Sequence, residues 1–129
     1  ESNIVSGIMH DDYDVEFAGK HFVCVDKGFD KMEPVDVVIR PEDIRVKEPD
    51  GTTIDGTVET VTFKGVHFEM IVDSFGTKWK IHSTKAAEVG SFIGMALTPE
   101  DIHIMHKSYA SDATDAEYLE GGAANEAGL

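Results

Sequence analysis

One phrase of sequence occurs twice in this chain, and this repeat constrains the fold more than any other feature. Residues 35–46 and residues 93–104 each contain an apolar run, the tetrapeptide Pro-Glu-Asp-Ile and a second short apolar run. Repetition of a whole strand-turn-strand phrase indicates two related structural units. The chain is therefore expected to fold as two similar lobes of one small β-domain.

The shared tetrapeptide predicts a turn between two strands. Proline fixes φ and has no N–H to give to a sheet ladder, so a strand that reaches it ends there. The two acidic residues that follow lie where a first helical turn favours negative charge. These turn residues, expected to have a purely architectural role, are Pro41, Glu42, Asp43, Pro99, Glu100 and Asp101. Period-2 alternation before each proline predicts that four side chains point into the core: Val37, Ile39, Met95 and Leu97.

The same alternation recurs along the rest of the chain, with turn signals between the segments. Strands are predicted near residues 4–9, 13–17, 21–25, 35–40, 45–47, 57–63, 66–73, 78–82, 92–97 and 102–106. No long amphipathic helix is predicted before residue 108. A chain of 129 residues that is 41% hydrophobic is large enough for one buried core. The fold class predicted is all-β.

The composition changes after Lys107. Residues 108–129 contain five acidic residues, no Lys or Arg, and few large apolar side chains. Such a segment cannot bury enough apolar surface to order itself. We therefore divide the chain into a β-domain at 1–107 and a flexible acidic tail at 108–129.

Charge and motif content exclude several classes of function. The net charge of -14 repels phosphate backbones, so we expect no nucleic-acid partner. The sequence contains no Gly-rich phosphate loop and no nucleophile motif, so we expect no catalytic residue in this chain. The single cysteine, Cys24, excludes an intramolecular disulfide, and its apolar neighbours predict a buried, unreactive thiol. The apolar runs are far shorter than the ~20 residues that span a bilayer.

The six histidines do not show a metal-binding spacing. His103 and His106 are three residues apart, which on a strand points them to opposite faces. The other four lie in different predicted strands, and sequence alone does not show whether they converge. Structural or surface roles are favoured, and no metal site is predicted.

An acidic cluster in the first predicted hairpin is the one candidate binding site. It consists of Asp11, Asp12, Asp14 and Glu16, beside Tyr13. Asp11 and Asp12 are expected to make the turn, because Asp side chains replace backbone bonds in turns. Asp14 and Glu16 should face solvent, opposite Val15 and Phe17. The cluster is either an ordinary solvated hairpin or a site for a divalent ion or a polyamine.

Four segments in order along the chain resemble one known family. Residues 1–7, 38–43, 56–65 and 99–103 are similar to the C-terminal TOBE (transport-associated OB) region of ABC importer ATPase subunits, above all those of spermidine/putrescine importers. The resemblance covers the chain from Glu1 to about His106. It implies an OB-like β-barrel built from two strand-turn-strand lobes.

The resemblance also implies a function. Glu1 would follow the nucleotide-binding domain of a longer subunit, which would bind ATP and Mg and would lie at the cytoplasmic face of the membrane. This fragment would carry no cofactor and no catalysis. It would regulate transport, contact its twin in a homodimer, and through the parent subunit serve the permease subunits, with a small-molecule effector as a further partner. The alternative left open is a ligand-binding OB module for an oxyanion or a cation, although Arg40 and Arg45 are the only arginines.

Overall fold

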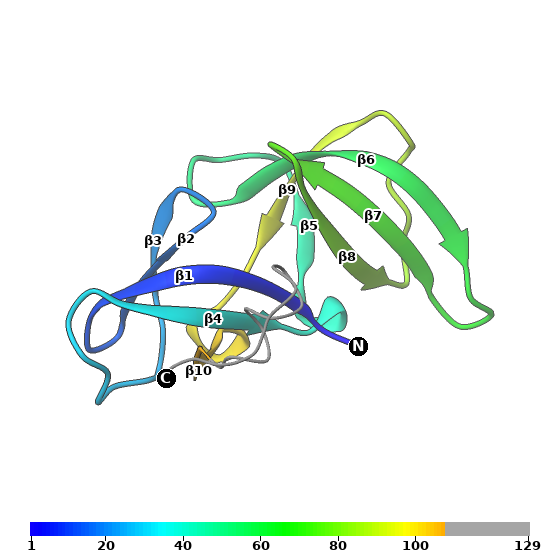
Figure 1. The fold of residues 1–129 in the computed structure, drawn as a ribbon. Coiled ribbons are helices and arrows are strands. Elements are labelled where there is room, and N and C mark those ends of the chain that lie inside the picture. Colours follow the sequence, from blue (N-terminus) through cyan, green and yellow to red (C-terminus); the bar gives the residue numbers. More distant parts are fainter. Residues whose placement is uncertain (108–129) are drawn as a thin grey trace, which may run out of the picture.

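The computed structural model describes residues 1–107 as two five-stranded antiparallel sheets (Figure 1). The first sheet has the order β10-β4-β1-β2-β3 and the second β5-β9-β6-β7-β8. The strands are β1 (Asn3–Asp11), β2 (Asp14–Phe17), β3 (Lys20–Val23), β4 (Glu33–Ile39), β5 (Arg45–Lys47), β6 (Ile54–Phe63), β7 (Phe68–Ser74), β8 (Thr77–Ser83), β9 (Phe92–Ala96) and β10 (His103–His106). The predicted all-β class is confirmed. The predicted tail at 108–129 lies outside the described residues.

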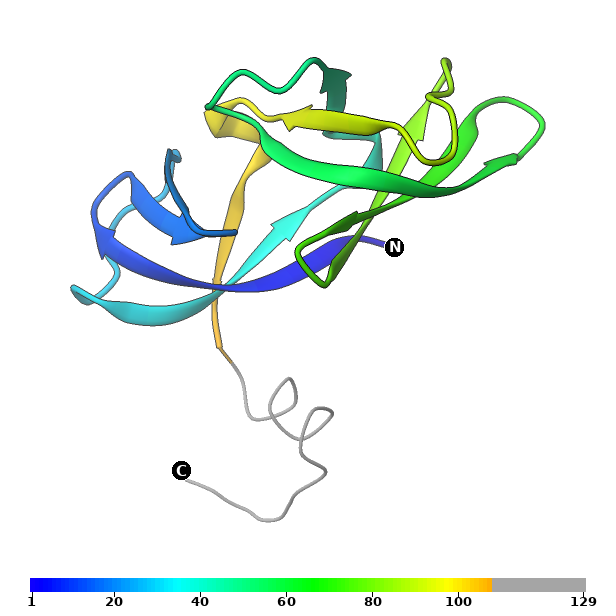
Figure 2. The ribbon, with the colours of Figure 1, turned by 90° about the horizontal axis from the view of Figure 1, so that it is seen from above.

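The path of the chain through the first sheet is repeated in the second. β1, β2 and β3 form a meander, and β4 returns to pair with β1. β6, β7 and β8 form the equivalent meander, and β9 returns to pair with β6. Figure 2 shows the blue strands of the first unit and the green strands of the second as two separate curved layers.

The two Pro-Glu-Asp phrases carry the chain between these layers. Each forms a one-turn 3₁₀ helix, η1 (Pro41–Asp43) and η2 (Pro99–Asp101). After η1, β5 joins the second sheet beside β9; after η2, β10 joins the first sheet beside β4. Each half therefore supplies the edge strand of the other half's sheet. The prediction that the two phrases occupy equivalent turns is confirmed.

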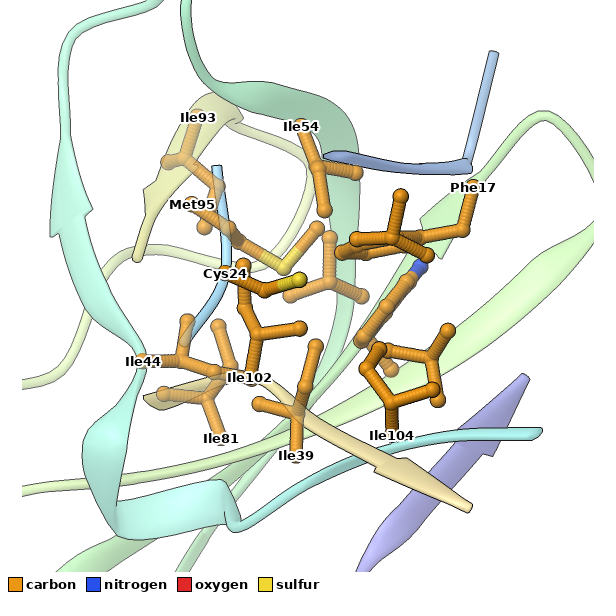
Figure 3. Close-up of a cluster of buried hydrophobic side chains, with 14 of the residues drawn as sticks. Phe17, Cys24, Ile39, Ile44, Ile54, Ile81, Ile93, Met95, Ile102 and Ile104 are labelled. Atoms are coloured by element: carbon orange, nitrogen blue, oxygen red, sulfur yellow. The ribbon is translucent and has the colours of Figure 1, made fainter. Parts of the chain in front are cut away.

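The core lies between the sheets and consists mainly of valine and isoleucine side chains, with Phe17 and Trp79 among them (Figure 3). Val37, Ile39 and Met95 are at most 1% exposed, as predicted, and Cys24 is also buried. Leu97 is only partly buried, because β9 ends at Ala96 and Leu97 lies beyond its last ladder pair. Burial raises the pKa of the Cys24 thiol, which disfavours the reactive thiolate.

The first turn differs from the prediction by one residue. Asp11 still pairs with Asp14 in the β1–β2 ladder, and the turn is made by Asp12 and Tyr13, with Tyr13 at φ 66°. The reason is an irregularity in β1 between Met9 and Asp11, which adds one residue to that strand. Asp11 is consequently the last residue of the strand.

Among residues 1–107 no helix has the length and the apolar character needed to cross a bilayer.

Candidate functional site on the first hairpin

The predicted acidic cluster is divided between two places. Val15 and Phe17 are buried in the core, so Asp14 and Glu16 point to the outer face of the first sheet, as the alternation predicted. Asp11 and Asp12 lie at the end of the hairpin instead. The structure therefore brings the four carboxylates together as two pairs rather than as one group.

The pair at the turn contacts the loop before β4. An Asp11 carboxylate oxygen lies 3.0 Å from Lys31 Nζ, and this hydrogen bond lowers the pKa of Asp11. The backbone N–H of Gly28 donates to Asp12 Oδ1 at 3.1 Å. Tyr13, 46% exposed, is held through its backbone, which bonds to Cys24 and Asp26. These contacts fix the loop against the hairpin.

The pair on the outer face contacts two histidines. His10 Nε2 lies 2.7 Å from Glu16 Oε1, and His21 Nδ1 lies 2.8 Å from Asp14 Oδ1. The centroids of the two imidazole rings are 4.5 Å apart. The hydrogen bond to Asp14 raises the pKa of His21. One ligand atom from each of His10, Glu16 and His21 lies within 4.8 Å of the other two.

Sequence reasoning did not find this histidine–carboxylate group. The pairing of Glu16 with His21 follows from the two-residue turn at Ala18 and Gly19, which the sequence does indicate. The position of His10 does not follow, because it depends on the irregularity in β1. No motif in the sequence marks that irregularity.

The remaining histidines lie elsewhere. The rings of His67 and His82 have centroids 4.3 Å apart and are tilted by 32° to each other. Both residues line a groove of about 930 Å³, which Arg45 and Lys85 also line. His106 Nδ1 lies 2.7 Å from Glu33 Oε2, and this bond lowers the pKa of Glu33. His103 is exposed.

The two one-turn helices are joined by Arg45. Its guanidinium donates to the backbone oxygen of Asp43 at 3.1 Å and to Asp101 Oδ2 at 3.2 Å. Arg40 Nε donates to Asp43 Oδ2 at 3.0 Å. Both arginines therefore take part in holding the turns. Pro41 is buried, whereas Glu42 and Glu100 are exposed.

The segment that contains the two Pro-Glu-Asp turns matches a family of known domains. The family model described as "TOBE domain" matches residues 37–105, a segment that contains both Pro-Glu-Asp turns. The chain belongs to the TOBE domain family.

Curated relatives are similar to this chain over a longer stretch than the family model. The chain is 55% identical over 106 residues to the spermidine/putrescine import ATP-binding protein PotA of Clostridium novyi. It is 52% identical over 107 residues to the PotA of Clostridioides difficile, and 49% identical over 107 residues to that of Desulfitobacterium hafniense. The matches cover 82–83% of this chain, but the chain spans only 30–31% of these relatives' length.

A solved structure shares the fold. The cytoplasmic molybdate-binding protein ModG, with molybdate bound, superposes with a TM-score of 0.67 at 13% identity. The match covers 81% of this chain and 96% of that one. At this identity the likeness establishes the OB-type architecture alone.

Proposed function

We propose that the chain is the C-terminal regulatory and dimerisation domain of an ABC importer ATP-binding subunit that serves polyamine uptake. The observation that carries the proposal is the 49–55% identity to three PotA proteins over 106–107 residues, which is 82–83% of this chain. ATP and Mg would bind in a nucleotide-binding region of the parent subunit, at the cytoplasmic face of the membrane, where the permease subunits are its partners.

A domain exchange tests the proposal. The matching C-terminal part of the Clostridium novyi protein would be replaced by this chain, and spermidine uptake and ATP hydrolysis measured with the assembled transporter. We expect the chimera to retain both activities. The Clostridium novyi protein truncated before this C-terminal part should lose spermidine uptake or the regulation of that uptake. A chimera that assembles but behaves like the truncated protein would contradict the assignment. The isolated chain is expected to release no phosphate from ATP.

The proposed contact with the twin subunit draws support from Phe75. This side chain is 93% exposed and has φ 51° in the turn between β7 and β8, a conformation that costs free energy for a bulky residue. The equivalent turn residue of the first half is Ala18, and the two line a groove of about 360 Å³. We propose that Phe75 packs against the twin.

Sedimentation velocity tests this contact. The strong negative charge opposes association, so added salt should favour the dimer of the wild-type chain by screening. Phe75→Ala should remain monomeric under the same conditions. A wild-type chain that stays monomeric at high protein and salt concentration would remove the proposed interface.

A polyamine effector at the first hairpin remains a prediction. Its candidate ligands are Asp11, Asp12, Asp14 and Glu16 beside Tyr13, and a polyamine would displace the partners just described. Calorimetry with spermidine on the wild type and on Asp12→Asn/Asp14→Asn tests it, with weak, salt-sensitive heats expected only for the wild type. Equal heats would exclude the site.

An oxyanion-binding module is less well supported. The molybdate-binding neighbour shares the fold at 13% identity. Arg40 and Arg45 would be the natural anion ligands, but both already donate to groups of the Pro-Glu-Asp turns.

A further inference from the structure

We propose that His10, Glu16 and His21 form a binding site for a divalent transition-metal ion of the zinc class. Two imidazoles and one carboxylate are a ligand set that zinc and its neighbours prefer, and that magnesium and calcium do not. The proposal concerns a site in this chain alone and does not depend on the transporter assignment.

The geometry needs little adjustment to hold an ion. His10 Nε2 and Glu16 Oε1 are 2.7 Å apart, and one ligand atom from each of the three residues lies within 4.8 Å of the others. Ligand atoms bound to one zinc ion at about 2.1 Å lie at most about 4.2 Å apart. Side-chain rotation on the surface is enough to close this difference, since the side chains of Glu16 and His21 are 39% and 58% exposed.

The strands place the three residues on one solvent-facing surface. Glu16 pairs with His21 across the β2–β3 ladder, so their side chains point to the same side. His10 lies at the irregularity in β1, between the ladder residues Met9 and Asp11, and its Nε2 reaches Glu16. Met9 and Val15 take the opposite face, inside the core. The group is thus fixed by a packed sheet rather than by a loop.

Asp14 supplies the support that metal-binding histidines usually have. Its Oδ1 lies 2.8 Å from Nδ1 of His21. In the tautomer whose Nδ1–H donates to Asp14, the Nε2 lone pair is directed away from that bond and is available to a metal. A carboxylate behind a histidine ligand fixes the ring and increases its basicity.

The second half of the molecule has a cation at the position that corresponds to the proposed metal site. In the first half, Glu16 pairs with Ile8 on one side and with His21 on the other. In the second half, Asp73 pairs with Thr57 on one side and with Lys78 on the other. Asp73 therefore corresponds to Glu16, and Lys78 corresponds to His21. The strand irregularity at His10 recurs between Val58 and Thr60, at Glu59.

In the second half, the ammonium group of Lys78 lies between the carboxylates of Glu59 and Asp73. Lys78 Nζ lies 2.7 Å from Glu59 and 3.2 Å from Asp73, and the two carboxylates raise the pKa of Lys78. The first half has histidines in place of the lysine and one of the carboxylates. A metal ion held by these histidines would neutralise the charge of Glu16, as the ammonium group of Lys78 neutralises the charges of Glu59 and Asp73.

Isothermal titration with ZnCl₂ on the 129-residue chain tests the proposal. The decisive variant is His21→Lys. It introduces the residue type that the second half has at the equivalent position, Lys78, and so keeps a positive charge beside Glu16. We expect a single saturable zinc site in the wild type and at least about 10-fold weaker binding in His21→Lys and in His10→Gln. Asp14→Asn should weaken binding by about 10-fold, since it removes only the group behind the ligand.

Two controls keep the result specific. His103→Gln alters an exposed histidine outside the group and should bind zinc as the wild type does. Melting curves should show that His21→Lys is folded and that zinc raises the melting temperature of the wild type but not of this variant. Absence of saturable zinc binding in the wild type would overturn the proposal. So would equal zinc affinity in the wild type and in a folded His21→Lys.

Discussion

The two halves of the domain are alike where they face the core and differ where they face solvent. In both, a meander of three strands is followed by a return strand, a one-turn helix and a strand given to the other sheet. On the outer face, the first half has two histidines around Glu16, whereas the second has Lys78 between Glu59 and Asp73. Packing therefore fixes the shared path, and the exposed ladder positions are free to carry different chemistry.

The two crossing turns differ in a similar way. η1 has no side-chain cap, and its Asp43 accepts a bond from exposed Arg40. η2 has a capping box, in which Thr98 and Asp101 each bond to the backbone of the other. The aspartate of the tetrapeptide is therefore held by an ion pair with Arg40 in η1, and in η2 by the backbone N–H of Thr98 together with Arg45. The difference lies in the residue before the proline.

The largest expected difference between the halves is at the residues two before the prolines. Ile39→Ala should lower the free energy of unfolding by about 2–5 kcal/mol, because Ile39 is fully buried and its truncation leaves a cavity. Leu97→Ala at the equivalent position should cost less, since Leu97 is only partly buried. Urea unfolding of both variants measures the two losses. Similar losses would mean that the two halves share the core equally.

A smaller effect, common to both halves, is expected at two close approaches of β-strands. A Cβ on Gly7 would lie 2.8 Å from the backbone oxygen of Glu16, and one on Gly56 would lie 2.6 Å from that of Asp73. Backbone cannot yield as a flexible side chain does, so Gly7→Ala and Gly56→Ala should each cost about 1–3 kcal/mol.

The exposed neighbour Thr57 provides the control for these variants. Thr57→Ala, on the same strand as Gly56, should change stability by no more than about 0.5 kcal/mol in the same urea experiment. If only one glycine variant is destabilised, the two strand crossings are not equivalent.

Much of the fold could be predicted from the sequence, because alternation and proline act locally. The ten strands, the equivalence of the two Pro-Glu-Asp turns and the burial of Ile39 and Met95 all follow from period 2 and from a missing N–H. The exchange of edge strands between the halves could not be predicted. It depends on which distant strand each short segment, such as β5, finds as its partner.

The candidate site was harder to predict for the same reason. The outward direction of Asp14 and Glu16 followed from the buried Val15 and Phe17. The convergence of His10 with His21 requires one extra residue in β1, and that irregularity also moved the turn from Asp11 to Tyr13. His10, which has no partner in the β1–β2 ladder, is thus the reason why the turn was predicted one residue too early and why the histidine pair was not predicted.

The smallest expected effect compares the two turns and depends on pH. Burial alone would raise the pKa of Asp101, but hydrogen bonds from Thr98 and Arg45 outweigh it and hold the pKa below its ordinary value. Because the folded-state pKa is lowered, this stabilisation is present above the unfolded pKa of about 3.9 and is lost as pH falls through the folded pKa. Asp101→Ala should therefore cost about 0.5–2 kcal/mol at pH 7 and progressively less in urea unfolding below about pH 4. Asp43→Ala should cost less at pH 7, because it removes a surface ion pair and no cap. Equal losses for the two variants at pH 7 would show that the capping box does not distinguish η2 from η1.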